Sequence, residues 1–209
     1  MIENLLSFSL ATLALALSPG PDNIYVLTQS LANGVKSGIA TTAGLISGCI
    51  VHTTLLAFGI SALITASEEI FYGIKVFGAI YLLYLAYKVY KSDAKVTYSE
   101  SAPKKSNWEL FKQGVFMNLV NPKVMIFFLA FFPAFLWNTS ESLVLQFYIL
   151  GITFMIVSFI TFSSIAILAG SVSTLLLRNK GIGTILKWLQ IVVFIGIAIL
   201  FWCLRSSFN

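Results

Sequence analysis

The chain has 209 residues, of which 58% are hydrophobic and 10% are charged, and its formal net charge is +5. Because about 25% of the residues in an ordinary soluble domain are charged, this composition excludes a typical water-soluble fold. The basic residues gather between apolar segments instead of forming a stripe on one surface, which argues against nucleic-acid binding.

Long charge-free stretches dominate the sequence. They cover residues 4–21, 37–67 and 142–177, and a helix of about 20 residues crosses the hydrocarbon core of a bilayer. These stretches are apolar on all sides, whereas the strands of a membrane barrel alternate in polarity. The sequence therefore predicts an all-α, polytopic membrane protein with six transmembrane helices, at residues 4–33, 38–66, 70–90, 110–137, 142–170 and 183–205.

The first predicted helix is expected to stay in the protein. It is preceded by Glu3 rather than by a basic region, and no small-residue cleavage site occurs before Ser18. A removable signal peptide is therefore not expected.

The charges between the predicted helices fall into two unequal groups. Connections on one side of the membrane carry ten basic residues, and those on the other side carry two basic residues and the acidic Glu3, Glu68, Glu69 and Glu141. Cytoplasmic loops carry the excess of lysine and arginine, so both termini are predicted to lie outside and residues 91–109 in the cytoplasm. The ten are Lys36, Lys88, Lys91, Lys95, Lys104, Lys105, Lys112, Arg178, Lys180 and Lys187, and the two are Lys75 and Arg205.

The polar linker at residues 91–109 divides the chain into two similar halves, residues 1–90 and 110–209. Each half contains a proline-interrupted segment, then a span that starts with glycine, then a span that starts with a lysine motif. Since each half has three spans, the second half must enter the membrane in the opposite orientation. The sequence thus predicts a 3+3 inverted repeat, with LSPGPDNIYVL and LVNPKVMIFFL as corresponding segments.

Helix breaks are predicted in the first and fourth spans. Pro19 and Pro21 each remove a backbone donor, and Gly20 between them adds freedom, so the first helix should break there. Pro122 predicts the equivalent break in the second half. A broken helix is tolerated at membrane depth only inside the protein or beside a wet cavity, so both breaks should face the interior of the bundle.

Polar side chains accompany both breaks. An aspartate at the centre of a membrane helix costs roughly 2.5–3.5 kcal/mol, and such residues are usually retained for a ligand or ion pathway. The alternative is a structural kink in which Asp22 caps the following half-helix. We predict a substrate site at the level of the two breaks, where Asp22 and Lys123 pair or hold opposite ends of a ligand; its candidate residues are Ser18, Asp22, Asn23, Tyr25, Gln29, Asn118, Asn121 and Lys123.

His52 is the only histidine of the chain and follows Gly44 and Gly48 at four-residue steps. The glycines allow close approach of another helix, within the chain or between two chains, and His52 would then point into the bundle. Asp22 and His52 are the two candidates for proton coupling, although a lone histidine is more often a packing residue. The hydroxyls of Thr153, Thr161 and Ser164 are expected to bond their own helix backbone.

The segments SPGPDNIYVLTQSLANGVKSG, GLISGCIVHTTLLAFG and NLVNPKVMIFFLAFFP together resemble the LysE/RhtB family of bacterial amino-acid exporters. The resemblance covers nearly the whole chain. It implies a multi-pass protein of the bacterial inner membrane that exports amino acids or close derivatives in exchange for protons. The matching motif positions are Pro19, Gly20, Pro21, Asp22 and Asn23 in the first half and Asn121, Pro122 and Lys123 in the second.

The function predicted from the sequence is secondary export of small zwitterions, with neutral amino acids favoured. A basic amino-acid substrate is an open alternative, and so is the choice between monomer and homodimer. A membrane thiol-disulfide electron carrier is a weaker alternative, because Cys49 and Cys203 lie away from the predicted breaks. A metal-ion exporter is also weaker, because one histidine and no acidic or cysteine cluster provide no soft-metal site. No enzyme activity, metal or cofactor is expected.

Overall fold

The computed structural model describes residues 1–17, 20–92, 102–138, 141–171 and 180–203, and these residues form helices and short connections without a strand. Within the helices, the side chains of Pro122, Lys123 and a few others are outside the description. The elements are α1 (Ile2–Leu17), α2 (Pro21–Asn33), α3 (Val35–Leu55), the π-helical turn η1 (Leu56–Ile60), α4 (Ser61–Ala66), α5 (Glu68–Lys91), α6 (Asn107–Val120), α7 (Pro122–Phe131), the 3-10 turn η2 (Phe132–Phe135), α8 (Leu143–Ile167) and α10 (Lys180–Cys203).

Helices occupy all six ranges in which membrane helices were predicted. Among the described residues, Val35–Ala66 and Leu143–Ile167 are each long and apolar enough to cross a membrane by themselves. The pair α1 and α2 meets the same criterion when taken together, with a bend of 59° between the two helices. The all-helical class is thus confirmed, and the predicted breaks coincide with the boundaries between α1 and α2 and between α6 and α7.

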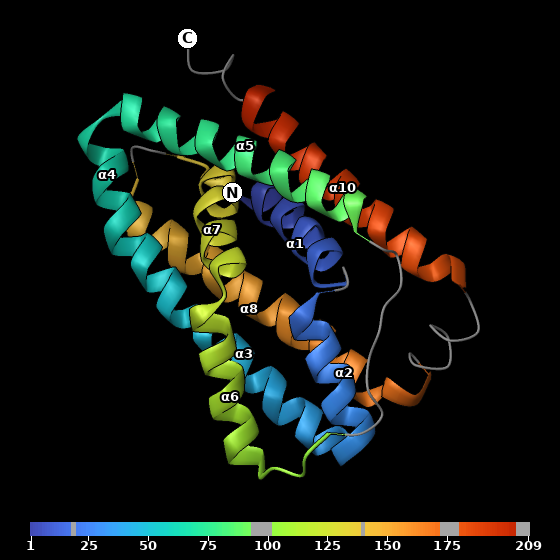
Figure 1. The fold of residues 1–209 in the computed structure, drawn as a ribbon. Helices are drawn as coiled ribbons and strands as arrows, with labels where there is room; N and C mark the ends of the chain where they lie inside the picture. Colours follow the sequence, from blue (N-terminus) through green and yellow to red (C-terminus); the bar gives the residue numbers. More distant parts are fainter. Residues whose placement is uncertain (18–19, 93–101, 139–140, 172–179, 204–209) are drawn as a thin grey trace.

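The two broken segments run in opposite directions through the molecule. In Figure 1 the chain descends from α1 in the upper half to α2 in the lower half, whereas it rises from α6 at the bottom to α7 above. Helix α3 packs against α6 and α8, α1 packs against α8, and α5 lies along α10. In Figure 1 the boundary between α1 and α2 and the boundary between α6 and α7 both lie near the middle of the bundle.

Glycines set the distance between α3 and α6. A Cβ atom on Gly44 would lie 2.0 Å from the backbone oxygen of Phe111, and one on Gly114 would lie 2.5 Å from the backbone oxygen of Thr41. Only glycine permits such close backbone contact, as in other small-residue helix crossings. The prediction that Gly44 and Gly48 admit a second helix is therefore confirmed, and the helix they admit is α6 of the same chain.

A cluster of phenylalanine rings fills the space between α1, α7, η2 and α8. Phe8 of α1 lies at its centre, with ring centroids 4.9 Å from Phe131 and 5.2 Å from Phe132. In a membrane the alternative environment of these rings is lipid, so packing rather than removal from water holds them together, and each aromatic pair contributes about 0.5–1.5 kcal/mol. The members of this phenylalanine cluster are Phe8, Phe127, Phe128, Phe131, Phe132, Phe135 and Phe154. It packs the bundle on one side of the breaks.

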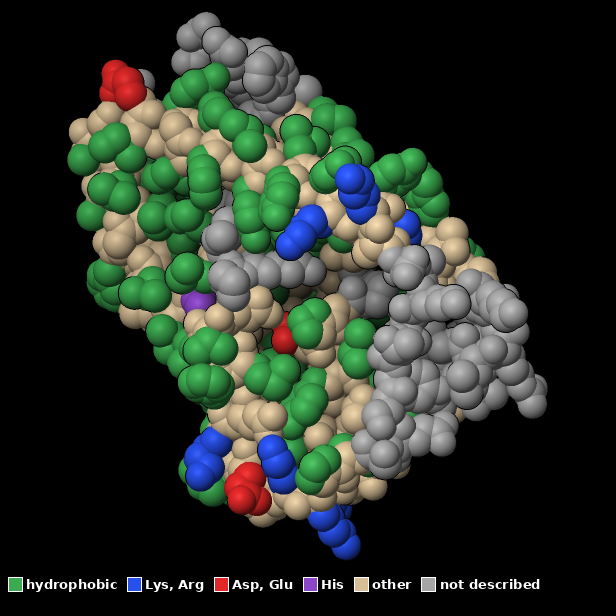
Figure 2. Space-filling view, viewed as in Figure 1, with side chains coloured by type: hydrophobic (Ala, Val, Ile, Leu, Met, Phe, Trp, Pro, Cys, Tyr) green, Lys and Arg blue, Asp and Glu red, His purple; other side chains and the backbone are tan. Residues whose placement is uncertain are grey.

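The outer surface of the bundle is apolar. Figure 2 shows hydrophobic side chains over much of the face formed by α3, α4 and α5, with lysines at the lower end near the start of α6. Soluble proteins rarely expose continuous apolar areas of this kind. Large apolar side chains more than half exposed occur on most helices, among them Leu10, Phe58, Ile80, Ile160 and Val192. Such a surface is suited to contact with lipid.

Candidate functional site

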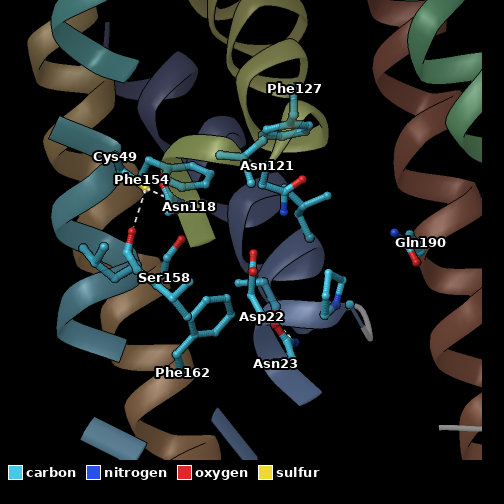
Figure 3. Close-up of a pocket in the computed structure, with 17 residues that line it drawn as sticks. Asp22, Asn23, Cys49, Asn118, Asn121, Phe127, Phe154, Ser158, Phe162 and Gln190 are labelled. Carbon is cyan, nitrogen blue, oxygen red and sulfur yellow. Dashed lines mark hydrogen bonds between the residues drawn. The ribbon is translucent and has the colours of Figure 1, made fainter. Parts of the chain in front are cut away.

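A cavity of about 100 Å³ lies between the two helix breaks. One water molecule needs about 10–15 Å³, so this space can hold several waters or a small solute. Residues at the two breaks and on α1, α2, α3, α6, α7, α8 and α10 line it. They are Leu15, Ala16, Gly20, Pro21, Asp22 and Asn23; Leu45, Ile46 and Cys49; Asn118, Asn121, Val124 and Phe127; Phe154, Ser158 and Phe162; and Gln190. Figure 3 shows the side chains that line it.

At the first break, a side chain of α2 binds a backbone carbonyl at the end of α1. Gly20 is extended (φ −150°, ψ 172°) and precedes Pro21, the first residue of α2, where a missing N–H costs nothing. Asn23 reaches back and donates its Nδ2–H to the backbone oxygen of Ala16 at 2.7 Å. This bond satisfies one of the carbonyls that α1 leaves without a helical partner.

At the second break, His52 binds a backbone carbonyl that the proline leaves without its usual helical donor. In a continuous helix the N–H of residue 122 would donate to the backbone oxygen of Asn118, but proline has no N–H. His52 Nε2 lies 3.3 Å from that oxygen, and the N–H of Asn121 lies at the same distance. Since a carbonyl can only accept, the Nε2 atom of His52 must carry the hydrogen of this bond. The imidazole therefore replaces the donor that the proline removed.

Asp22 lies in the first turn of α2, and its carboxylate points into the cavity in Figure 3. The N-terminal end of a helix carries partial positive charge, which stabilises a carboxylate there by about 0.3–1 kcal/mol at an exposed site and more at a partly buried one. Asn118 and Ser158 lie across the cavity from it, on α6 and α8. Polar groups from both halves of the chain thus face one space.

The structure brings together six of the residues predicted for the site and the breaks. These six line the cavity: Gly20, Pro21, Asp22, Asn23, Asn118 and Asn121.

Three other predicted residues are described but do not line this cavity. Gln29 is buried on α2 and accepts a hydrogen bond from Asn33 at 2.9 Å, and Tyr25 lies one turn before it. His52 is buried behind Asn118, with its ring centroid 5.4 Å from that of Phe128. Ser18, Pro19 and the side chains of Pro122 and Lys123 lie outside the described residues, so the predicted approach of Asp22 and Lys123 is still a prediction.

Sequence reasoning missed several residues of the cavity wall, and it was wrong to place Cys49 away from the breaks, because Cys49 on α3 lines the cavity between them. Gln190 is 3% exposed and is the contribution of α10. A glutamine in the middle of an apolar span is itself a signal, because polar residues in membrane helices usually face the protein interior. Ser158 had no such signal, because α8 carries several hydroxyls. The expected self-bonding of hydroxyls is confirmed for Thr153, Thr161 and Ser164, each at 2.8 Å from a backbone oxygen.

Comparison with known proteins gives two consistent findings. The family described as LysE type translocator matches residues 13–204 of the chain. The chain is 32% identical over 163 residues to the homoserine/homoserine lactone efflux protein of Salmonella typhimurium strain LT2, and 33% identical over 163 residues to the protein of the same name from Salmonella typhi. Each match covers 78% of this chain and 79% of the relative. No solved structure gives a significant match.

Proposed function

This chain belongs to the family of LysE-type translocators, and from that premise we propose that it is a secondary exporter of amino acids or close derivatives that works by antiport with protons. The family and the apolar helices make it a multi-pass membrane transport protein. Its relatives are named for homoserine and homoserine lactone. Both compounds are small amino-acid derivatives without a charged side chain, which favours neutral substrates here.

The observation that carries this proposal is the cavity at the meeting point of the two helix breaks. An amino acid presents an ammonium group and a carboxylate. Asp22 offers a negative group to the ammonium, and the N-terminus of α7, with Lys123, offers positive charge to the carboxylate. Among the described residues of the cavity wall, Asp22 is the only acidic one. A basic side chain on the substrate would need a further acceptor, so neutral amino acids fit this wall better.

The proposed architecture is a 3+3 inverted repeat of residues 1–90 and 110–209 joined by the cytoplasmic linker 91–109. Counterpart helices that lie next to a two-fold axis contact each other, and two such pairs, α3 with α8 and α5 with α10, are in contact. The packing of α3 on α6 also has its counterpart in the packing of α8 on α1. The opposite directions of the two broken segments in Figure 1 further support the inversion.

Proton coupling is assigned to Asp22, with His52 as the second candidate. A carboxylate in the cavity can bind either the substrate ammonium or a proton, and this competition is what antiport requires. His52 contacts the cavity wall from the side away from the cavity, because it is hydrogen-bonded to the backbone oxygen of Asn118 in the last turn of α6.

The proposal is tested with Asp22→Asn, which removes the charge and keeps the size of the side chain. Cells or vesicles loaded with labelled homoserine should lose export by at least about tenfold, the effect of roughly 1.4 kcal/mol. The matched control is Glu3→Gln, the same chemical change at an exposed residue of α1. Unchanged export by Asp22→Asn, at equal amounts of protein in the membrane, would contradict the assignment.

A further inference from the structure

Three lysine side chains meet where α5 ends against α10. Lys88 and Lys91 lie in the last turn of α5 and are exposed, and Lys187 lies in the second turn of α10. The ammonium of Lys187 donates a hydrogen bond to the backbone oxygen of Ser92, the C-cap residue of α5, at 2.7 Å. Three positive charges from distant parts of the chain are therefore gathered at one place.

Each of the three ammoniums lies over a tyrosine ring of α5. From Nζ to the ring centroid, the pairs are Lys88 and Tyr84 at 5.6 Å, Lys91 and Tyr87 at 5.0 Å, and Lys187 and Tyr90 at 5.7 Å. All three rings are at least 50% exposed. A ring within about 6 Å attracts the ammonium but does not neutralise it. Within the described part of the chain, no carboxylate forms an ion pair with these lysines, so their charges stay uncompensated there.

The two lysines of α5 point toward the membrane rather than toward water. A helical side chain leans toward the N-terminus of its helix, and the ammoniums of Lys88 and Lys91 lie over rings four residues earlier in the chain. In the proposed topology α5 ends at the cytoplasmic surface, so the N-terminal direction leads into the bilayer. A lysine near a helix end usually directs its charge to water. These two charges are instead directed at the headgroup layer of the membrane.

Aromatic and apolar side chains surround the three charges. Trp188 of α10 is 50% exposed, and its ring centroid lies 6.2 Å from that of Tyr90, so the aromatic surface continues from α5 onto α10. Tyrosine and tryptophan are enriched at the headgroup level of membranes. One turn further into the bilayer, Ile80 of α5 and Val192 of α10 are 62% and 64% exposed. Figure 2 shows lysine side chains next to hydrophobic ones over the end of α5.

We propose that this basic seam, formed by Lys88, Lys91 and Lys187 with the four aromatic rings beside them, binds the headgroup of an anionic phospholipid. The phosphate accepts hydrogen bonds from the ammoniums, and the acyl chains lie on the apolar surface of α5 and α10. Basic pockets between membrane helices on the cytoplasmic side bind such headgroups. A lipid bound here contacts both helices and joins the end of α5 to α10. No residue of the seam lines the cavity between the breaks, so this inference goes beyond the proposed export function.

The experiment measures lipid binding to the detergent-purified full chain by native mass spectrometry. Phosphatidylglycerol should bind at least about tenfold more tightly than phosphatidylcholine, because the phosphate of phosphatidylcholine is neutralised by the ammonium of its own headgroup. The double variant Lys88→Gln, Lys91→Gln removes two charges that contact only rings of their own helix, so it should fold normally. With about fivefold in affinity for each lysine near an anionic lipid, it should bind phosphatidylglycerol about 25-fold more weakly and phosphatidylcholine as the wild type does.

The matched control is the double variant Lys105→Gln, Lys112→Gln at the start of α6. It removes the same net charge, and Lys112 also lies over an exposed aromatic ring, with Nζ 5.9 Å from the centroid of Trp108. Helix α6 packs mainly against α3, away from the seam. This variant should bind phosphatidylglycerol as tightly as the wild type. Equal binding of the two lipids by the wild type, or equal losses of phosphatidylglycerol affinity in the two double variants, would overturn the lipid site.

Discussion

The close crossing of α3 and α6 predicts that Gly44→Ala destabilises the protein, whereas Gly196→Ala on α10, where there is no close contact, should not. In Gly44→Ala the new methyl group would lie 2.0 Å from the backbone oxygen of Phe111 and 2.8 Å from its carbonyl carbon. Both atoms belong to the α6 backbone, so no side chain can rotate away and the helices must separate. In Gly196→Ala on α10, nothing lies within 4 Å of the new methyl group.

The expected magnitudes follow from these distances. Overpacking in a well-packed interior costs about 1–3 kcal/mol, and replacing a helical glycine by alanine returns about 0.5–1 kcal/mol. Because the contact at residue 44 is with backbone, we take the upper part of the range and expect Gly44→Ala to lose roughly 2 kcal/mol net. Gly196→Ala keeps only the favourable part and should gain about 0.5–1 kcal/mol.

Both effects are measured as melting temperatures in detergent, determined from the fraction of protein that is still monodisperse after heating. At about 2–4 °C per kcal/mol for a chain of this length, Gly44→Ala should melt roughly 4–8 °C below the wild type, and Gly196→Ala slightly above it. A Gly44→Ala protein that melts at or above the wild-type temperature would refute the close crossing. Equal losses in the two variants would show instead that glycine-to-alanine changes are harmful regardless of contact.

Two further predictions concern hydrogen bonds at the ends of α6. His52→Leu removes the donor to the last turn of α6 and should lower the free energy of unfolding by about 1–3 kcal/mol in thermal melts. His52→Gln keeps an N–H donor and should recover part of this loss. If His52→Gln exports substrate with an unchanged pH profile, His52 is excluded from proton coupling. At the other end, the backbone N–H of Ser106 and then its hydroxyl donate to the carboxylate of Glu109 and lower its pKa below the ordinary value of 4.5. Because the pKa of Glu109 is lower in the folded state than in the unfolded state, the stabilisation from this capping box is present above pH 4.5 and is lost as the pH falls through the folded-state pKa. Ser106→Ala should raise the Glu109 pKa in an NMR titration. An unchanged pKa would contradict the capping role.

The positions of the helices and of the breaks followed from local chemistry. Uninterrupted apolar length predicts a membrane helix, and proline interrupts a helix wherever it occurs in its interior, since it lacks the N–H. Asp22 and Asn121 could likewise be placed beside the breaks, because their neighbours in the sequence are the prolines themselves. The close approach at Gly44 and Gly48 was predictable for the same reason, as only small residues permit it.

What only the tertiary structure decided is which polar side chains face one space. The sequence predicted Tyr25 and Gln29 in the same site as Asp22, but the cavity ends within the first turn of α2, so neither lines it. It gave no reason to choose Ser158 among the hydroxyls of α8, because that choice depends on the rotation and crossing angle of α8 against α3. Those quantities are set by the fit of glycines and phenylalanine rings between helices far apart in the chain, which a one-dimensional pattern does not contain.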